Sequence, residues 1–192
     1  MDTIFGIPGD GINGVFESLR ERQDKIKFVQ VRHEEAAAFA ACGYAKFTGK
    51  LGVCLATSGP GGIHLLNGLY DAKLDHVPVV ALVGQQARSA LGASYQQEVD
   101  LHNLFKDVAS EFVALASVPE QVRHLIDRAV RIAHSKRTVT CVILPNDLQQ
   151  LPYEDPPMAH GATHTGVGYA GPAKLPDEGP VAEELFTRIP ST

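Results

Sequence analysis

The chain has 192 residues, 44% of them hydrophobic, and a formal net charge of −5, which suits one globular domain with part of a second. Because it carries no basic stripe, nothing in its charge points to a nucleic-acid partner, and no apolar run reaches the roughly 20 residues needed to span a bilayer. The first residues lack the basic and apolar regions of a signal peptide. These features predict a cytoplasmic protein without a membrane-spanning segment.

In chain order, the pattern predicts a strand at 3–7, a helix at 12–22, a strand at 27–32, a helix at 34–48, a strand at 51–56, a helix at 61–74, a strand at 77–83, a short helix at 98–107, a strand at 112–116, a helix at 119–135 and a strand at 138–144. Gly49 is a typical helix stop. The continuous apolar run at 77–83 is typical of a strand buried on both faces. The alternation predicts an α/β fold, a doubly wound and mostly parallel sheet of about six strands with helices on both faces.

The composition changes near residue 151. Seven of the twelve prolines lie from Pro152 onward, among glycine, histidine and threonine and without sustained periodicity. Such a stretch is typical of an extended linker or tail. We therefore expect one domain at 1–150 and a Pro/Gly-rich linker or tail at 151–192.

Three scattered cysteines, Cys42, Cys54 and Cys141, match neither a disulfide framework nor a metal-ligand pair. Each lies in an apolar predicted strand or helix, so we expect buried thiols rather than nucleophiles. We expect no metal ligands on this chain.

A glycine-rich turn follows the first predicted strand. Residues 9–14 read Gly-Asp-Gly-Ile-Asn-Gly, and Glu34 lies 20 residues beyond Gly14, a spacing that matches a dinucleotide-binding fingerprint. Pro8 interrupts the turn where a tight connection is wanted, and Asp10 would place a negative charge beside a pyrophosphate. A simple turn before a helix is the interpretation we favour, and an NAD-binding Rossmann-type domain remains the alternative.

Two further segments follow the second and third predicted strands. The first reads Arg32-His33-Glu34-Glu35, and the second is the glycine-rich segment at 57–62, Thr-Ser-Gly-Pro-Gly-Gly. Ligands of open α/β sheets bind outside the carboxyl ends of the strands. Both segments are therefore expected to face one crevice.

Four motifs taken together resemble the N-terminal pyrimidine-binding domain of thiamine-diphosphate-dependent enzymes. They are Phe-Gly-Ile-Pro-Gly at 5–9, Arg-His-Glu-Glu-Ala-Ala at 32–37, Thr-Ser-Gly-Pro-Gly at 57–61 and Gln-Glu-Val-Asp at 97–100. The resemblance covers roughly residues 4–151 and is closest to the pyruvate oxidase and acetolactate synthase group. The segments at 61–71 and 75–79 are similar to the pyruvate oxidase branch in particular.

The resemblance implies that Glu34 is the catalytic residue, a glutamate that hydrogen-bonds N1′ of the cofactor's aminopyrimidine and so promotes loss of the proton from C2 of the thiazolium. Glu35 is its rival, but the family's His-Glu order selects Glu34. Shielding from water would raise the pKa of this carboxyl, whereas a helix start favours the anion. The other interpretation of Glu34 is a helix-start carboxylate that partners the dipole.

The resemblance also implies cofactor-binding roles for residues around the pyrimidine. They are Pro8, Thr57, Ser58, Gly59, Pro60, Gly61, His64 and Gln97. His64 is alternatively a helix histidine packed on the sheet. The register of Gln97 stays open because Gln96 stands where the family has an aromatic residue. The alanine run at 36–45 allows close helix approach, either at a domain interface or on the chain's own sheet.

The resemblance further implies a site completed elsewhere, because the diphosphate-binding domain with its Mg²⁺ motif, the FAD-binding central domain of pyruvate oxidases and the leading helix are not found in this sequence. We expect the chain to bind thiamine diphosphate weakly and to be inactive without a diphosphate-binding domain or subunit. A full-length enzyme of this kind would act on a 2-oxo acid and form a homo-oligomer. A non-catalytic assembly module remains a further alternative.

Overall fold

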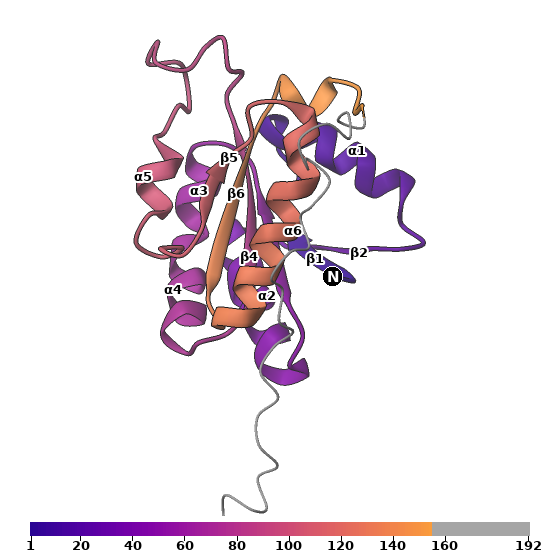
Figure 1. Cartoon of the computed structure of the whole chain (residues 1–192), viewed down its shortest axis with the longest axis vertical. Coiled ribbons are helices and arrows are strands. Elements are labelled where there is room, and N and C mark those ends of the chain that lie inside the picture. Colours follow the sequence, from indigo (N-terminus) through magenta and orange to yellow (C-terminus); the bar gives the residue numbers. More distant parts are fainter. Residues whose placement is uncertain (155–192) are drawn as a thin grey trace, which may run out of the picture.

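Six strands form an all-parallel sheet in the computed structural model, which describes residues 1–154 (Figure 1). The order across the sheet is β2-β1-β3-β4-β6-β5. The strands are β1 (Thr3–Gly6), β2 (Lys27–Gln30), β3 (Gly52–Ala56), β4 (Val79–Gln85), β5 (Val113–Leu115) and β6 (Val139–Pro145). This sheet confirms the predicted α/β fold. Most of the predicted tail lies outside the described residues.

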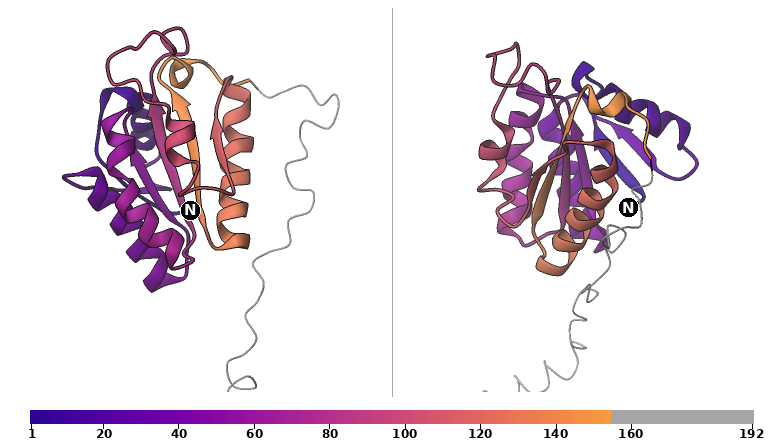
Figure 2. Two further views of the ribbon diagram at one scale, coloured as in Figure 1. Left: turned by 90° about the vertical axis from the view of Figure 1, so that its left-hand side faces the viewer. Right: turned by 45° about the horizontal axis from the view of Figure 1, so that its top comes forward.

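Helices cover both faces of the sheet, which lies between two helical layers (Figure 2). The α-helices are α1 (Asn13–Glu21), α2 (Glu34–Thr48), α3 (Pro60–His64), α4 (Leu66–Leu74), α5 (Leu101–Phe105) and α6 (Pro119–Lys136), and the 3₁₀ turns are η1 (Asp10–Ile12) and η2 (Leu148–Gln150). Apolar residues of α2, α4 and α5 share one core cluster, and those of α1 and α6 share the other. Within β3, Cys54 contributes to the first cluster and Val53 and Leu55 to the second, as the alternation of side chains along a strand requires.

The strand order reverses between β1 and β3. The chain runs from β1 outward to β2, and β3 then pairs with the other side of β1, with Phe5 opposite Cys54 and Gly6 opposite Leu55. Such a reversal opens a crevice outside the carboxyl ends of the two strands, where ligands of α/β sheets bind. The segments that follow β1, β2 and β3 therefore all begin at this one edge of the sheet.

Two predicted helices differ from those observed. The helix expected at 61–74 is divided into α3 and α4, because the amide of Leu65 bonds to the carbonyl of Gly62 at 3.3 Å, a tightened i→i+3 turn. The helix expected at 98–107 is shorter, because the side chain of Asp100 accepts a bond from the amide of Asn103 and so caps the helix start.

The alanine run of α2 packs inside the domain. Ala37, Ala38, Ala41 and Ala45 are buried, and a Cβ added at Gly68 of α4 would lie 2.5 Å from the amide nitrogen of Phe39. Small side chains on α2 and the glycine on α4 thus let the two helices approach closely. The run serves packing of this helix against its own domain.

All three cysteines are free and buried, as predicted. Burial raises the pKa of Cys42 and of Cys54 to about 12, so both thiols stay protonated at neutral pH. Their role in the fold is that of small apolar side chains.

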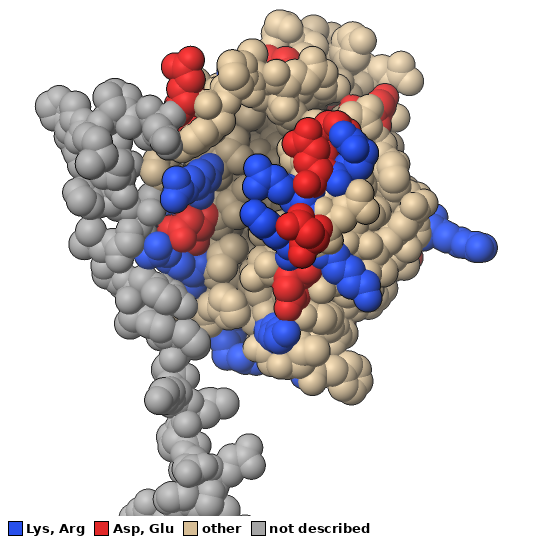
Figure 3. All heavy atoms as spheres, turned by 90° about the vertical axis from the view of Figure 1, so that its right-hand side faces the viewer, with Lys and Arg blue, Asp and Glu red and all other residues tan. Residues whose placement is uncertain are grey.

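On the side that carries α1 and α6, basic and acidic side chains intermix around a hollow (Figure 3). A hollow of about 480 Å³ lies between these helices, and its lining includes Val15, Ile126 and Leu148. It contains neither Glu34 nor Thr57, and it belongs to the face opposite α2. Among residues 1–154, no helix is both long and apolar enough to cross a membrane.

Candidate functional site

The turns that follow β1 and β3 are packed directly against each other. The amide of Gly11 donates to Oγ1 of Thr57 at 3.0 Å, and a Cβ added at Gly9 would lie 2.6 Å from Cβ of Thr57. A Cβ at Gly11 would likewise meet Oγ of the buried Ser58 at 2.7 Å. Glycines after β1 therefore bring Thr57 and Ser58 against the first turn, where the strand order reverses.

Gly59 has a backbone conformation that favours glycine, with φ of 61°. A Cβ there would lie 2.5 Å from the carbonyl oxygen of Gln97. Gln97 itself is exposed and has a positive φ of 61°. The close backbone approach puts the loop before α5 beside the turn after β3, so Gln97 lies at the predicted edge.

Glu34 begins α2, which follows β2 after the three residues 31–33. His33 caps this helix, because its Nδ1 accepts a bond from the amide of Glu35 at 3.2 Å. The Glu34 side chain is only 15% exposed, and its Oε2 lies 3.0 Å from Nδ1 of His64 at the end of α3. The structure thus joins two predicted site residues from different segments.

Two opposing effects act on the carboxyl of Glu34. Burial raises its pKa, but the hydrogen bond with His64 and a bond from its own backbone amide lower it, and the net shift is downward from the ordinary value of 4.5. Glu34 is therefore ionised at neutral pH. Because an ionised carboxylate can only accept hydrogen bonds, the proton in its contact with His64 belongs to Nδ1 of the imidazole.

Gly61 lies beside Thr57 and the other oxygen of Glu34. A Cβ added at Gly61 would lie 2.8 Å from Cγ2 of Thr57 and 3.5 Å from Oε1 of Glu34. Any larger side chain at this position would fill the space between these groups. The absence of a side chain here leaves a small cradle between Thr57 and Oε1 of Glu34.

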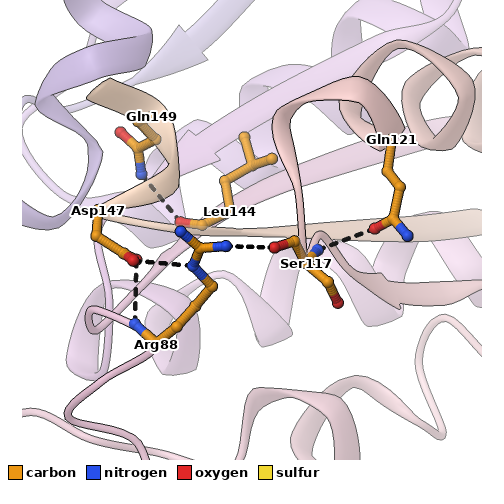
Figure 4. A network of polar contacts seen from close by, with 6 residues as sticks. All are labelled: Arg88, Ser117, Gln121, Leu144, Asp147 and Gln149. Carbon is orange, nitrogen blue, oxygen red and sulfur yellow. Dashed lines mark hydrogen bonds and ion pairs between the residues drawn. The ribbon is translucent and has the colours of Figure 1, made fainter. Parts of the chain in front are cut away.

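A polar network fixes the loop after β4 at the same edge (Figure 4). Nε of Arg88 pairs with Asp147 at 2.8 Å, and the guanidinium also donates to the carbonyl of Ser117. The amide of Ser117 in turn donates to Gln121 at 2.9 Å. Burial raises the pKa of Asp147, but the hydrogen bonds from Arg88 lower it by more than burial raises it. The net shift of this pKa is downward, so the pair is ionic at neutral pH.

Residues that follow β6 donate hydrogen bonds to the turn after β1. Nε2 of Gln149 donates to the carbonyls of Gly11 and Leu144, each at 2.9 Å, and Nδ2 of Asn146 donates to the carbonyl of Asp10 at 3.3 Å. The turn after β1 is therefore held by Thr57 on one side and by the end of β6 on the other.

The predicted site residues gather at one edge, but with different exposure. Glu34 and Thr57 are half-buried and Ser58, Gly59 and Gly61 are buried, whereas the exposed ones are Pro8, Pro60, His64 and Gln97. Glu35 points to another partner, since its Oε1 accepts a bond from Asn67 of α4 at 2.5 Å. The structure thus separates the two neighbouring glutamates.

Sequence reasoning missed some residues of this edge. His33 is not among the expected site residues, yet the centroid of its ring lies 4.4 Å from that of His64. Gln86 was not considered, but its Nε2 contacts Oγ of Ser58 at 3.3 Å. Gln86 and Gln149 each follow a strand end, and the rule that pointed to Glu34 would have found both.

Comparison with known proteins identifies the family. The sequence matches the thiamine pyrophosphate enzyme N-terminal TPP binding domain over residues 1–104. It is 47% identical over 151 residues to YdaP of Bacillus subtilis, covering 77% of this chain and 26% of that protein. It is 45% identical over 157 residues to the pyruvate oxidase of Lactiplantibacillus plantarum, covering 81% of this chain and 26% of that protein. The acetolactate synthase of Arthrospira platensis is 39% identical to this chain over 172 residues, which are 88% of this chain and 29% of that protein.

The chain spans about a quarter of the length of these relatives. The family match and the relatives agree with the resemblance carried by the four motifs, which is thereby confirmed. The chain therefore belongs to the thiamine pyrophosphate enzyme family and carries its N-terminal TPP binding domain.

Proposed function

We propose that this chain binds the aminopyrimidine ring of thiamine diphosphate in the crevice between β1 and β3, with Glu34 as the catalytic residue. The observation that carries the proposal is the carboxylate of Glu34, which is 15% exposed and has Oε1 facing the cradle beside Gly61. Family membership supports this choice of ligand. An acceptor-only carboxylate in such a cradle suits a ring nitrogen that carries a proton.

The other predicted residues would enclose the ring. Pro8 and Thr57 would flank it, and Ser58, Gly59, Pro60 and Gly61 would let the backbone come close. His64 would orient the carboxylate through Oε2 and leave Oε1 for the ligand, and Gln97 would approach across the turn after β3. When bound, thiamine diphosphate supplies the nucleophilic carbon and the electron sink needed for chemistry on a 2-oxo acid.

We infer that the working site also needs a diphosphate-binding domain or subunit, which would supply Mg²⁺. The match to the N-terminal TPP binding domain of the family supports that inference. A second domain over the crevice would exclude water and raise the pKa of Glu34 toward the range useful for proton transfer. Similarity to a pyruvate oxidase and an acetolactate synthase supports a 2-oxo acid substrate such as pyruvate. The proposed domain is 1–150, followed by a linker, and FAD would bind only to a further domain.

The dinucleotide alternative has less support. The amide of Gly11, which a pyrophosphate would need, already donates to Thr57, and the side of Gly14 is packed on Gln149. The assembly-module alternative predicts that Glu34 has no catalytic role. In an assembly with a diphosphate-binding partner, Glu34→Gln should abolish turnover and Glu35→Gln should retain most of it. Unchanged turnover in Glu34→Gln would favour the assembly module.

A test on the chain itself uses amide chemical shifts in nuclear magnetic resonance. Thiamine and thiamine diphosphate should both shift the amides of residues 34–36, 57–59 and 61–64 with similarly weak affinity, because only the pyrimidine is bound here. Glu34→Gln should lose these shifts and the matched variant Glu35→Gln should keep them. Submicromolar binding of thiamine diphosphate would contradict the need for a second domain, and shifts at 9–14 with NAD would revive the dinucleotide alternative.

A further inference from the structure

Three potential metal ligands meet at the carboxyl edge of the sheet. One donor atom from each of His33, Glu34 and His64 lies within 4.8 Å of the other two. The two imidazole rings are 4.4 Å apart between centroids and tilted by 32°. Both histidines are exposed, with the His64 side chain 43% exposed, so a dissolved ion can reach them.

The contact between Glu34 and His64 already brings two of the ligand atoms together. Nδ1 of His64 lies 3.0 Å from Oε2 of Glu34, close to the separation of two ligands on one zinc ion. An ion between these atoms would replace the shared proton, which the neutral imidazole would carry on Nε2 instead. This arrangement is present in the chain before any ion binds.

His33 requires a small rearrangement. Its Nδ1 accepts the bond from the amide of Glu35 that caps α2, so His33 must release this bond to supply a lone pair. Ligands of a tetrahedral zinc lie about 3.4 Å apart, worked from metal–nitrogen distances of about 2.1 Å. The widest pair therefore has to close by at most roughly 1.4 Å, which rotation of exposed rings can supply.

We propose that His33, Glu34 and His64 form a binding site for a transition-metal dication, with Zn²⁺ as its preferred physiological occupant. Two imidazoles and one carboxylate match zinc sites that keep a position open for water. Mg²⁺ and Ca²⁺ prefer all-oxygen sets and do not suit it. The site is distinct from the Mg²⁺ expected at the diphosphate, because it lies at the pyrimidine end.

Occupation of this site would block the cofactor. The ion would coordinate Glu34, the carboxylate that the proposed function assigns to the pyrimidine. The ion and the cofactor could therefore not bind at the same time. This consequence rests on the proposed function, whereas zinc binding itself rests only on the three side chains. Zinc would therefore act as a competitive inhibitor of cofactor binding.

The direct test is a titration of the full chain with Zn²⁺ by calorimetry, together with the visible absorption of bound Co²⁺. One equivalent should bind, with a tetrahedral or five-coordinate Co²⁺ spectrum. His33→Gln, His64→Gln and Glu34→Gln should each weaken binding by at least roughly tenfold, because removal of a ligand costs no less than loss of an outer-shell partner. Circular dichroism of each variant checks that it is folded.

Matched controls remove other histidines. The pair His160→Gln with His164→Gln, and His102→Gln on α5, should leave zinc affinity unchanged. Loss of binding in the 160/164 double variant would overturn the proposal, as would unchanged binding in both His33→Gln and His64→Gln.

The competition is tested separately. Excess Zn²⁺ should abolish the chemical shifts that thiamine causes at 57–64, and Mg²⁺ at the same concentration should not. If zinc binds and thiamine shifts nothing even without zinc, the metal site stands and the proposed function fails. If thiamine binds and zinc does not, the metal site fails alone.

Discussion

The close approach of α2 and α4 predicts opposite effects for one substitution at two helical glycines. In Gly43→Ala, the new methyl group meets nothing within 4 Å, whereas in Gly68→Ala it would lie 2.5–2.7 Å from three atoms of α2, two of them backbone. Replacing a helical glycine by alanine stabilises by about 1 kcal/mol in both cases. Overpacking costs about 1–3 kcal/mol. We expect a cost at the upper end of this range where the clash is with backbone atoms, because backbone moves aside less readily than a side chain.

Gly43→Ala should therefore gain about 1 kcal/mol in the free energy of unfolding and Gly68→Ala should lose about 2 kcal/mol net, a difference of about 3 kcal/mol. At about 2–4 °C per kcal/mol for a domain of this size, the melting temperatures should move in opposite directions by several degrees. Urea and thermal unfolding followed by circular dichroism measure both. If Gly68→Ala is as stable as the unmodified chain, the helices are not packed as closely as described.

Other predictions concern the crevice edge. Arg88→Ala should lower the free energy of unfolding by about 1 kcal/mol, because the ion pair with Asp147 is about one-third exposed and such pairs contribute about 0.2–1 kcal/mol. Urea unfolding measures this loss, and Asp147→Asn should show a similar one. Since the pKa of Glu34 is below 4.5, its carboxylate stabilises the fold above that pH, and the contribution is lost as the pH falls through the lowered pKa. The stability difference between the unmodified chain and Glu34→Gln should thus shrink on acidification, and a gap that widens below pH 4.5 would contradict the lowered pKa. Gly61→Ala should cost about 1–3 kcal/mol through Thr57 and abolish the thiamine shifts; a variant with full thiamine binding would refute the cradle.

Much of the fold was predictable from local pattern. The apolar run of β4 and the alternation of strands and helices are encoded by neighbouring residues, which is why the strand positions agree within a few residues. The division between α3 and α4 was not, because one backbone bond from Leu65 to Gly62 decides it. Helix periodicity alone carries no sign of such a bond.

The candidate site was predictable in position more than in contacts. The carboxyl-edge rule and the family motifs placed Glu34 and Thr57 at one edge. They could not give the bond between Glu34 and His64, since it depends on how far α3 advances before its turn. Nor could they decide the direction of the pKa shift of Glu34, because burial and the local hydrogen bonds act in opposite directions.

The bond from Gln149 to Gly11 spans 138 positions of the chain, and this has a consequence for the order of folding. β6 lies between β4 and β5, so β5 has no partner strand until β6 is in place. Contacts this distant in sequence form late and slow the folding of a chain. During synthesis, β4 therefore waits with an open edge, which invites pairing with another chain, and the crevice acquires its final shape only when the last strand and the turn after it have emerged.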